Sequence, residues 1–279
     1  MASPRNLLAV DLSYQTYRAS AAHKQLTSGR TFTGGLYGFL VTLAKQIRET
    51  KATHVVVCRD LKPYRRSEVY PMYKQLRKKT ADEELLLLYQ ESIPLVLEAL
   101  DVIGIPTVGQ PGFESDDCIG WFVERHRNRF DNIYAASNDS DLYQLLWVEN
   151  FRVLRQGIED VVDRERLAAG PLGMTPDEFM LASALQGTHN DIEGIPGVGQ
   201  KTALKIVKDP GLLRQYRERW GEIIDRNLAL IKLPHPEFPS TRLPSPAHSF
   251  ELRELYKFCG RFEIEATKSM IDSFEQVCP

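Results

Sequence analysis

The sequence lacks the features that mark several classes of protein. No apolar run approaches the length of a membrane-spanning helix, and the amino terminus has no signal-peptide core. The four cysteines form neither a CxxC pair nor a zinc spacing, and two of them lie in apolar segments, as small hydrophobic residues do. Internal repeats and low-complexity tracts are also missing. These absences predict a protein of the reducing cytoplasm that does not bind membranes.

What is present is an ordinary globular composition. The chain has 279 residues, of which 43% are hydrophobic and 26% are charged. This length predicts one large domain, or a domain with an appendage, with enough apolar material for a core.

Acidic residues recur where apolar runs end or glycine-rich turns begin. Asp11 ends one such run, and Asp60 follows a second. The other acidic positions of this kind are Glu114, Asp116, Asp117, Asp139, Asp141 and Asp191. Runs of this type predict parallel strands, whose carboxyl ends deliver side chains to one edge of an open sheet. So many anions in one place would repel each other unless cations lay among them, and oxygen-only ligands favour Mg²⁺ or Mn²⁺.

A simpler explanation exists for each acidic residue taken alone. Asp116 and Asp117 could begin a helix that continues through Val123, where carboxylates suit the positive end of the helix dipole. Asp139 and Asp141 could likewise cap a helix. For a single position this explanation is the stronger one. For five groups of acids, most of them at apparent strand-to-helix junctions, a metal site is favoured.

Strand and helix patterns alternate through the first part of the chain. The predicted strands are Leu7–Asp11, His54–Arg59, Ile105–Val108 and Ile133–Ala136, with Phe151–Leu154 as a further candidate edge strand. Helical periodicity separates them, for example at Tyr37–Arg48 and Glu83–Val102. This alternation predicts an α/β fold with a mostly parallel central sheet flanked by helices.

Beyond Pro171 the pattern becomes helical. The cap signal Thr175-Pro176-Asp177-Glu178 predicts a helix that runs through Leu185, and the five prolines of Leu233–Pro246 predict an irregular crossing. We therefore expect an α/β domain at residues 1–170, which carries the acidic site. We expect a helical region at residues 171–279, whose C-terminal extension packs back on the core.

Basic residues are concentrated in one segment. The net charge is −2, but setting aside the eight candidate ligands leaves 35 basic residues against 29 acidic ones, a charge of +6. The concentrated basic residues are Arg59, Lys62, Arg65, Arg66, Lys74, Arg77, Lys78 and Lys79, with Tyr64, Tyr70 and Tyr73 interleaved. Such a run is either a solvated face or a contact surface for single-stranded nucleic acid. Its place directly after Asp60 favours the second interpretation.

A glycine-rich motif spans Gly194–Ala203. Gly197 and Gly199 lead into a predicted helix, whose first N–H groups would hold a phosphate of duplex DNA without reading its sequence. Lys201 and Lys205 fall four residues apart on that helix and would extend the contact. A G-x-G before a helix is a weak signal alone, and its position after Asp191 strengthens it.

These pieces together resemble the 5′-nuclease superfamily: phage flap endonucleases and 5′→3′ exonucleases, and the amino-terminal nuclease domain of bacterial DNA polymerase I. The resemblance covers essentially the whole chain. It rests on Val10-Asp11 with Arg18, Thr33–Gly38, Asp60, Tyr73-Lys74-x-x-Arg77, Gly112–Asp117, Ser137–Asp141 and Gly187–Ala203. It implies a PIN-like fold and a monomeric, metal-dependent nuclease of the bacterial or phage-infected host cytoplasm. Its substrate would be DNA with a 5′ flap, nick or 5′ end, met during replication or repair.

The resemblance also implies roles for the acidic residues. Asp11, Asp60, Glu114 and Asp116 would hold a first ion, with Asp117 close to both ion positions. Asp139, Asp141 and Asp191 would hold a second ion, partly through water. Both ions would be Mg²⁺ or Mn²⁺.

Basic and glycine residues receive roles in the same way. Lys74 and Arg77 would neutralise the scissile phosphate, which gives the implied catalytic set Asp11, Asp60, Lys74, Arg77 and Asp116. The implied DNA contacts are Arg18, Tyr73, Lys74, Arg77, Lys78, Lys79, Gly197, Gly199, Lys201, Thr202 and Lys205. Residues from about 60 to 83 would form a gateway or arch for the 5′ strand. Residues from about 175 to 210 would form a helix–hairpin–helix, with K⁺ as a further candidate ligand.

The last acidic motif departs from the family pattern. The family often has G-D-x-x-D, whereas this chain has Gly187-Thr188-His189-Asn190-Asp191. Thr188 cannot supply an anionic oxygen, which predicts a weaker or more hydrated second metal position. His189 is interpreted as a loop residue, because the surrounding candidate ligands are hard oxygens.

Three alternatives for the chemistry stay open at this stage. No Ser-His-Asp or Cys-His arrangement indicates a protein nucleophile, so water is the expected attacking group. A DNA nuclease is the leading hypothesis, followed by a primer-removing ribonuclease that acts on RNA–DNA hybrids. A non-catalytic DNA-binding homologue is the third, and the retained acids argue against it. The chain ends where the nuclease module ends in the family, so no polymerase is expected.

Overall fold

A six-stranded sheet forms the centre of the computed structural model, which describes residues 4–75, 82–171 and 173–278. The strands, in the order β5-β4-β1-β6-β7-β8, are β5 (Thr107–Val108), β4 (His54–Cys58), β1 (Asn6–Asp11), β6 (Asn132–Ala136), β7 (Phe151–Arg155) and β8 (Asp160–Val162). Neighbouring strands run parallel except β8, which pairs antiparallel with β7. The predicted mostly parallel sheet is confirmed. The edge strand on this side is β8, so the expectation of an edge position for Phe151–Leu154 is wrong.

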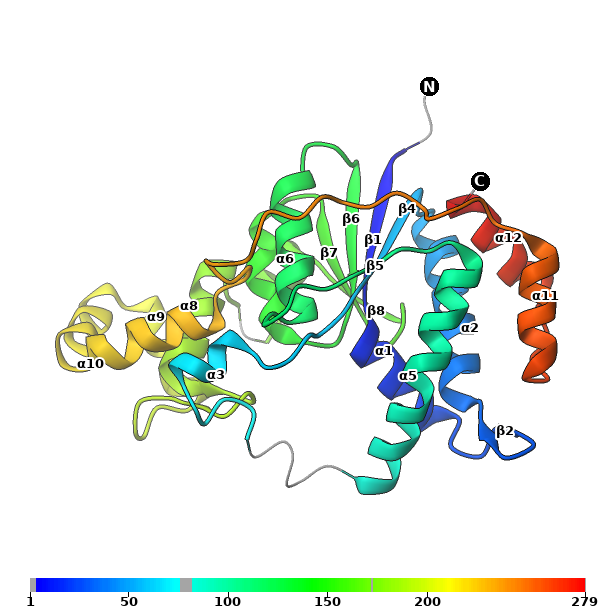
Figure 1. The fold of residues 1–279 in the computed structure, drawn as a ribbon. Coiled ribbons are helices and arrows are strands. Elements are labelled where there is room, and N and C mark those ends of the chain that lie inside the picture. The colour runs from blue at the N-terminus through cyan, green and yellow to red at the C-terminus, as the bar shows by residue number, and fades with distance from the viewer. Residues whose placement is uncertain (1–3, 76–81, 172, 279) are drawn as a thin grey trace.

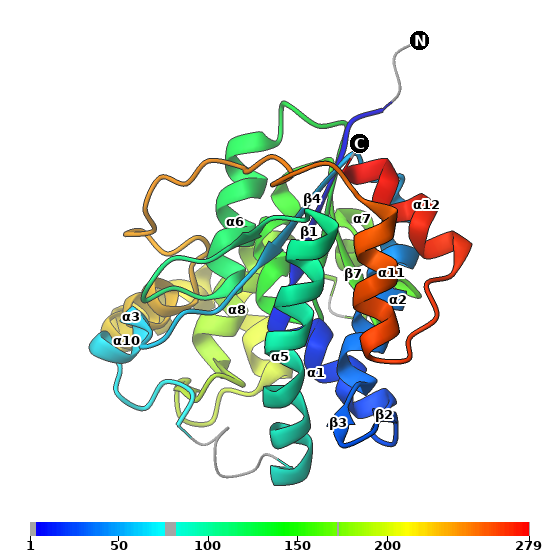
Figure 2. The same ribbon diagram turned by 45° about the vertical axis from the view of Figure 1, so that its right-hand side comes forward.

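Helices cover both faces of this sheet (Figures 1 and 2). One face carries α1 (Leu12–Ala22), α2 (Gly34–Thr50), α5 (Glu83–Ile103), α11 (Leu252–Arg261) and α12 (Lys268–Val277). The other carries α6 (Ser115–His126), the 3₁₀ helix η1 (Ser140–Trp147) and α7 (Arg164–Ala169). Along β1, Leu8 and Val10 point into the first core and Leu7 and Ala9 into the second. This alternation explains why a continuous apolar strand supports two layers of helices.

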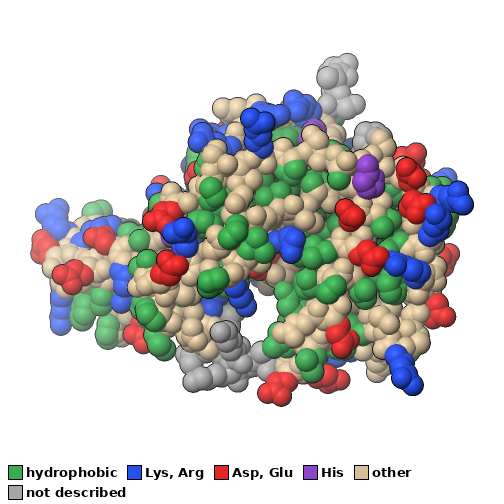
Figure 3. Space-filling view, in the orientation of Figure 1, with side chains coloured by type: hydrophobic (Ala, Val, Ile, Leu, Met, Phe, Trp, Pro, Cys, Tyr) green, Lys and Arg blue, Asp and Glu red, His purple; other side chains and the backbone are tan. Residues whose placement is uncertain are grey.

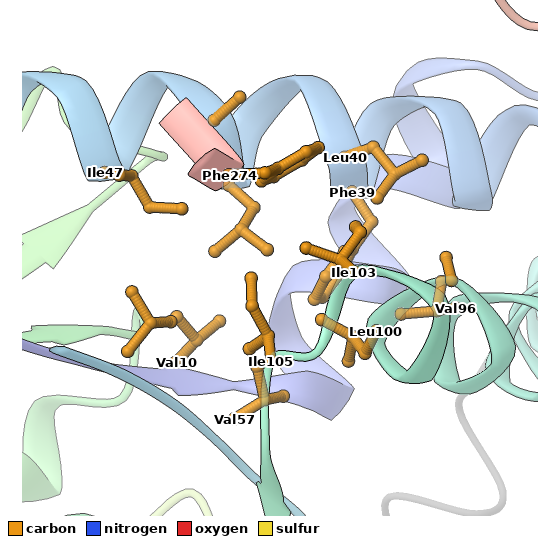
Figure 4. Close-up of a cluster of buried hydrophobic side chains, with 14 of the residues drawn as sticks. Val10, Phe39, Leu40, Ile47, Val57, Val96, Leu100, Ile103, Ile105 and Phe274 are labelled. Carbon is orange, nitrogen blue, oxygen red and sulfur yellow. The ribbon is translucent and has the colours of Figure 1, made fainter. Parts of the chain in front are cut away.

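The first core joins the two ends of the chain. Val10 of β1 and Val57 of β4 face Phe39 of α2, Leu100 of α5 and Phe274 of α12 (Figure 4). These five side chains are fully buried. The C-terminal helices are therefore part of the same core as the sheet.

A third, smaller core lies in the helical part of the chain, which projects from the sheet (Figure 1). Its elements are α8 (Pro176–Gln186), the hairpin of β9 (Gly187–Thr188) and β10 (Ile192–Glu193), α9 (Gln200–Lys208) and α10 (Pro210–Ile231). The predicted start of α8 is confirmed, because Thr175 and Glu178 form a capping box there. Ala182 of α8, Ile206 of α9 and Ile224 of α10 are buried together.

Residues 232–251 form the predicted irregular crossing between α10 and α11 (Figure 2). Phe238 packs into the second core, and Trp121 of α6 donates a hydrogen bond from Nε1 to the Thr241 carbonyl at 2.7 Å. The remaining elements are the hairpin of β2 (Thr27–Ser28) and β3 (Thr31–Phe32) and the short helix α3 (Arg65–Val69). Among the described helices, none is long and apolar enough to cross a membrane.

Candidate active site

Two strand ends deliver the first pair of carboxylates. Asp11 is the last residue of β1 and also caps α1, because its Oδ1 accepts the Tyr14 backbone N–H at 3.0 Å. Its Oδ2 accepts the Ser137 hydroxyl at 3.1 Å. Asp60 follows β4, and its Oδ1 accepts the Ser115 backbone N–H at 2.9 Å. The capping role and the placement at the sheet edge therefore coexist at Asp11, since a carboxylate has two oxygens.

Two more carboxylates join them from neighbouring elements. Asp116 lies in the first turn of α6, and Asp139 begins η1 by accepting the Asp141 backbone N–H at 2.9 Å. Asp11, Asp60, Asp116 and Asp139 line one cavity of about 670 Å³. Its other lining residues are Ser13, Tyr14, Tyr17, Lys74, Tyr89, Ser115, Ser137, Asn138, Ser140 and His189. Four of the eight predicted ligands therefore line this one cavity.

The electrostatics of this cavity fit a divalent cation. Burial and the nearby charge of Asp60 raise the pKa of Asp11 to about 7. Burial and the charge of Asp139 raise the pKa of Asp116 well above its usual range. Asp116 Oδ1 is buried and has no hydrogen-bond partner within the described part of the chain. Crowded carboxylate oxygens with one partnerless oxygen among them are a donor set that a hard cation would satisfy.

Asp117 takes a different place from the one expected. Arg66 is buried and donates to both Asp117 oxygens, at 2.6 and 2.8 Å, and to Glu114 Oε2 at 3.3 Å. Asp117 Oδ2 also accepts the Glu114 backbone N–H at 3.1 Å, which completes a capping box of α6. Both oxygens of Asp117 therefore accept hydrogen bonds, which complete the N-terminal cap of α6 and pair Asp117 with the buried Arg66. The metal-ligand role expected for it does not fit this geometry.

Glu114 holds Lys74 at the cavity. Lys74 Nζ pairs with Glu114 Oε1 and lies 5.5 Å from the centre of the Tyr64 ring. Burial acts to lower the pKa of Lys74, but the Glu114 charge and hydrogen bond outweigh burial and raise it. Lys74 is therefore a cation beside the carboxylates. Glu114 itself is a buried partner of Lys74 and Arg66 here, and it does not line the large cavity.

Tyr73 does not have the stacking position expected of a DNA contact. Its side chain is 4% exposed, and its hydroxyl donates to Glu114 Oε2 at 2.6 Å. Two other aromatic rings line the cavity, and neither was among the residues predicted from the sequence. Tyr17 and Tyr89 meet edge to face, with ring centres 5.9 Å apart. No sequence motif marks them, because their proximity depends on how α1 packs against α5.

The loop between β9 and β10 supplies the other wall. His189 Nε2 lies 3.5 Å from Asp139 Oδ2, and the buried Asn190 donates from Nδ2 to Asp141 Oδ2 at 3.0 Å. Burial acts to raise the pKa of Asp139, but the hydrogen bond and charge of His189, together with the Asp141 N–H and the charge of Lys74, outweigh burial and lower it. Burial and the charge of Asp139 raise the pKa of Asp141 to about 7.

Asp191 and Thr188 lie on a neighbouring cavity with Asp141, away from Asp11 and Asp60. Asp191 thus shares a cavity with Asp141, one of its two expected partners, but it is not in the group of Asp139, Asp141 and His189 whose donor atoms lie within 4.8 Å of one another. His189 and Asn190 contact the carboxylates of Asp139 and Asp141. The sequence analysis interpreted His189 as a loop residue and gave Asn190 no role. The signal that could have found them is the missing acid at Thr188, which shows that this loop differs from the family pattern.

Four of the expected DNA contacts, Gly197, Gly199, Lys201 and Lys205, are exposed. Gly197 has a φ of +79°, Gly199 caps α9, and a Cβ at either would meet nothing within 4 Å. Lys201 and Lys205 are exposed, and Thr202 is half-buried. Arg18 donates to the Gln156 carbonyl at 3.1 Å. Arg77, Lys78 and Lys79 lie outside the described residues. Basic side chains are visible on the projecting helical part (Figure 3).

The basic run after Asp60 is not one solvated face. Arg66 is buried against Asp117, while the exposed Arg65 pairs with Glu237 at 2.9 Å. Only part of this run is therefore available to a nucleic acid, and Lys74 is the described member that lines the cavity.

Comparison with known families decides the kinship of this chain. The family described as "5′-3′ exonuclease, N-terminal resolvase-like domain" matches residues 6–170. The chain belongs to this 5′-3′ exonuclease family. A 5′-3′ exonuclease of Aquifex aeolicus (strain VF5) is 30% identical over 255 residues, which are 90% of this chain and 82% of the relative.

Other members of the 5′-3′ exonuclease family are longer. DNA polymerase I of Mycobacterium tuberculosis (strain ATCC 25618 / H37Rv) is 30% identical over 232 residues, or 79% of this chain. The chain spans about a quarter (25%) of the length of that protein.

Solved structures show the same fold. T5 5′-exonuclease with bound zinc has a TM-score of 0.70 at 19% identity, covering 98% of this chain and 97% of that one. The bacteriophage T5 flap endonuclease in a pseudo-enzyme-product complex with DNA and metal ions has a TM-score of 0.69 at 19% identity, covering 97% and 100%. The match to the 5′-3′ exonuclease family ends at residue 170, so His189 and Asn190 lie beyond it.

Proposed function

We propose that this chain is a metal-dependent 5′ nuclease, which hydrolyses phosphodiester bonds of DNA at 5′ flaps, nicks or 5′ ends. The observation that carries the proposal is the cavity at the carboxyl edge of the sheet, where Asp11, Asp60, Asp116 and Asp139 face Lys74. The names of the relatives, a 5′-3′ exonuclease and a flap endonuclease, support this choice of substrate and reaction.

Two divalent cations, Mg²⁺ or Mn²⁺, are part of the proposal. Asp11, Asp60 and Asp116 would hold the first, and Asp139 and Asp141 would anchor the second. Such cations stabilise the negative charge that develops on the phosphoryl and leaving oxygens, and they lower the pKa of an attacking water. The partnerless oxygen of Asp116 supports the first position.

The side chains around the cavity would position the substrate. Lys74 would exchange Glu114 for the scissile phosphate and neutralise it there. Tyr17 and Tyr89 offer aromatic faces to the adjacent nucleobase, and stacking of this kind is indifferent to sequence. Arg77, Lys78 and Lys79 would guide the 5′ strand toward the cavity, and Arg18 would bind backbone phosphate beside it.

The helical part would hold the duplex. Gly197 and Gly199 leave open space before α9, so a sugar-phosphate backbone can approach the first N–H groups of that helix. Lys201, Thr202 and Lys205 would extend this contact as a helix–hairpin–helix, with K⁺ bound by loop carbonyls. The protein would act as a monomer in the cytoplasm, a compartment that its four free, buried cysteines favour.

A panel of labelled substrates tests the proposal. A 5′ flap, a nicked duplex, a single-stranded oligonucleotide and an RNA–DNA hybrid are incubated with the protein, with Mg²⁺ and with EDTA. We expect cleavage of the flap or nick in Mg²⁺ and none in EDTA. Faster cleavage of the hybrid would instead identify a primer-removing ribonuclease. Tight flap binding without cleavage in any divalent metal would identify a non-catalytic homologue.

A further inference from the structure

An imidazole lies beside the two carboxylates that would anchor the second cation of the proposed function. One donor atom from each of Asp139, Asp141 and His189 lies within 4.8 Å of the other two. His189 Nε2 and Asp139 Oδ2 are 3.5 Å apart, and the His189 side chain is 45% exposed. Asp191, the acid expected here, has a φ of +61° and lies on the neighbouring cavity, which Asp141 and His189 also line, but it is not among the three residues whose donor atoms lie within 4.8 Å of one another.

These spacings suit a shared ion. Nitrogen and carboxylate ligands bind a transition ion at about 2.0–2.2 Å, so two ligands of one ion lie no more than about 4.4 Å apart. A small closure of the β9–β10 loop would bring the three atoms to that range. Asn190, which donates to Asp141 Oδ2 at 3.0 Å, would then orient that carboxylate from behind.

A separate observation supports a cation in this cavity. Asp116 Oδ1 is buried without a hydrogen-bond partner among the residues described, and Asp116 lines the same cavity as Asp139 and His189. The side chain of Lys74 is already paired with Glu114. No protein cation is therefore left to pair with Asp116 among the residues named, and a bound metal ion would supply the missing positive charge.

We propose that Asp139, Asp141 and His189 form a mixed nitrogen–oxygen site that selects a first-row transition ion, Mn²⁺ or Co²⁺, over Mg²⁺. The inference rests on the proposed function, because it assigns the ion class of one of the two positions. Mg²⁺ prefers oxygen ligands and loses its waters reluctantly, whereas an imidazole ligand adds affinity for first-row transition ions, less for Mn²⁺ than for Co²⁺. The position built from Asp11, Asp60 and Asp116 has only carboxylates, so the two positions differ in selectivity.

Ion binding by the full chain tests the inference without any substrate. Mn²⁺ is titrated into the metal-free protein and followed by EPR, and pulsed EPR detects ¹⁴N coupling from a coordinated imidazole. The variants are His189→Gln and His189→Asp, with His248→Gln as a control on an exposed histidine far from the cavity. Circular dichroism checks that each variant folds, which the exposure of His189 favours.

We expect two Mn²⁺ ions in the parent protein, one of them with nitrogen coupling. His189→Gln should abolish that coupling and lower the binding affinity for one ion by about tenfold to a hundredfold, while the affinity for the other ion is unchanged. His189→Asp should also lose the coupling and bind Mg²⁺ more tightly than the parent in competition. His248→Gln should match the parent.

Absence of nitrogen coupling in the parent, or coupling that survives in His189→Gln, would overturn the inference. The proposed function fails separately from it. If the parent cleaves flaps in Mg²⁺ but shows no nitrogen coupling, only the ion assignment is wrong. If the coupling is present but no substrate is cleaved in Mg²⁺, Mn²⁺ or Co²⁺, the nuclease assignment is wrong and the mixed site stands.

Discussion

In the α/β part, Asp11 and Asp60 stand at strand ends around a cavity, and burial raises the pKa of Asp11. In the helical part, Gly199 and Lys201 are exposed on a turn and the helix that follows it. The first arrangement concentrates charge away from water, where electrostatic effects are strong. The second leaves backbone N–H groups and cations in water, where they would contact a phosphate without reading the base sequence. Rate and affinity should therefore depend on different parts of this molecule.

The largest expected effect tests the α/β part. Asp60→Ala and Asp116→Ala should reduce flap cleavage to background, because each removes a carboxylate from the proposed metal position. Binding of DNA should persist or tighten, since an anion that faces phosphate has been removed. Single-turnover cleavage and fluorescence anisotropy measure the two properties, with the exposed Asp272→Ala as a control. Near-normal turnover of both variants at saturating Mg²⁺ would contradict the site.

Lys74→Ala tests whether this lysine contributes to the cleavage rate or only to DNA affinity. If Lys74 neutralises the scissile phosphate in the transition state, the rate at saturating DNA should fall by about 10²–10³-fold. An ordinary surface cation would alter only affinity and its salt dependence. The matched control is Lys257→Ala, which removes an exposed cation that pairs with Glu254 on α11. An unchanged rate at saturating DNA would reject the catalytic role of Lys74.

Arg66 connects the two parts, so its removal should affect stability. Arg66→Met would leave Asp117 buried without its partner, which costs about 3–5 kcal/mol of the free energy of unfolding. Its neighbour provides the control, because Arg65 and Glu237 form an exposed pair worth about 0–1 kcal/mol. Urea denaturation measures both variants. Equal losses of unfolding free energy for Arg65→Met and Arg66→Met would show that the buried network around Arg66 does not stabilise the fold more than the exposed pair does.

Gly199→Val tests the helical part. Its φ of −96° suits any residue, and a Cβ there meets open space, so the valine should not strain the turn. The valine should obstruct an approaching phosphate and weaken duplex binding about tenfold, or about 1.4 kcal/mol. Cleavage of a single-stranded oligonucleotide should survive. The control is Gly260→Val, which also meets open space. Parent-like duplex binding by a folded Gly199→Val protein would remove this turn from the DNA grip.

The smallest effect concerns pH in the absence of metal. The pKa of Asp11 is raised from 3.8 to about 7, so the folded protein keeps a proton that the unfolded chain has already released. The free energy of unfolding of the metal-free protein should therefore fall as pH rises from about 4 to about 7. Urea midpoints in EDTA measure this slope, and Asp11→Asn should flatten it. A slope of the opposite sign in the parent, unaffected by Asp11→Asn, would contradict the raised pKa.

The sequence predicts the sheet-borne half of the site better than the loop-borne half. Asp11 and Asp60 follow apolar strands, and the register of parallel strands leaves them little choice of position. Asp117 was indistinguishable from a ligand in the sequence, because its role depends on Arg66, a partner 51 residues away. His189 and Asn190 depend on the path of a short hairpin, which no periodicity encodes.

The return of α11 and α12 to the first core has a consequence for how this chain can be divided. Phe274 and Leu255 complete a core whose other walls are α2 and α5, so the α/β part is discontinuous in sequence. The projecting helices α8 to α10 are then an insertion between two pieces of one folding unit. A fragment that stops at residue 170, where the family match ends, would expose the apolar faces of α2 and α5 to water. Replacing the inserted helices α8 to α10 while keeping both flanking segments would leave this core intact.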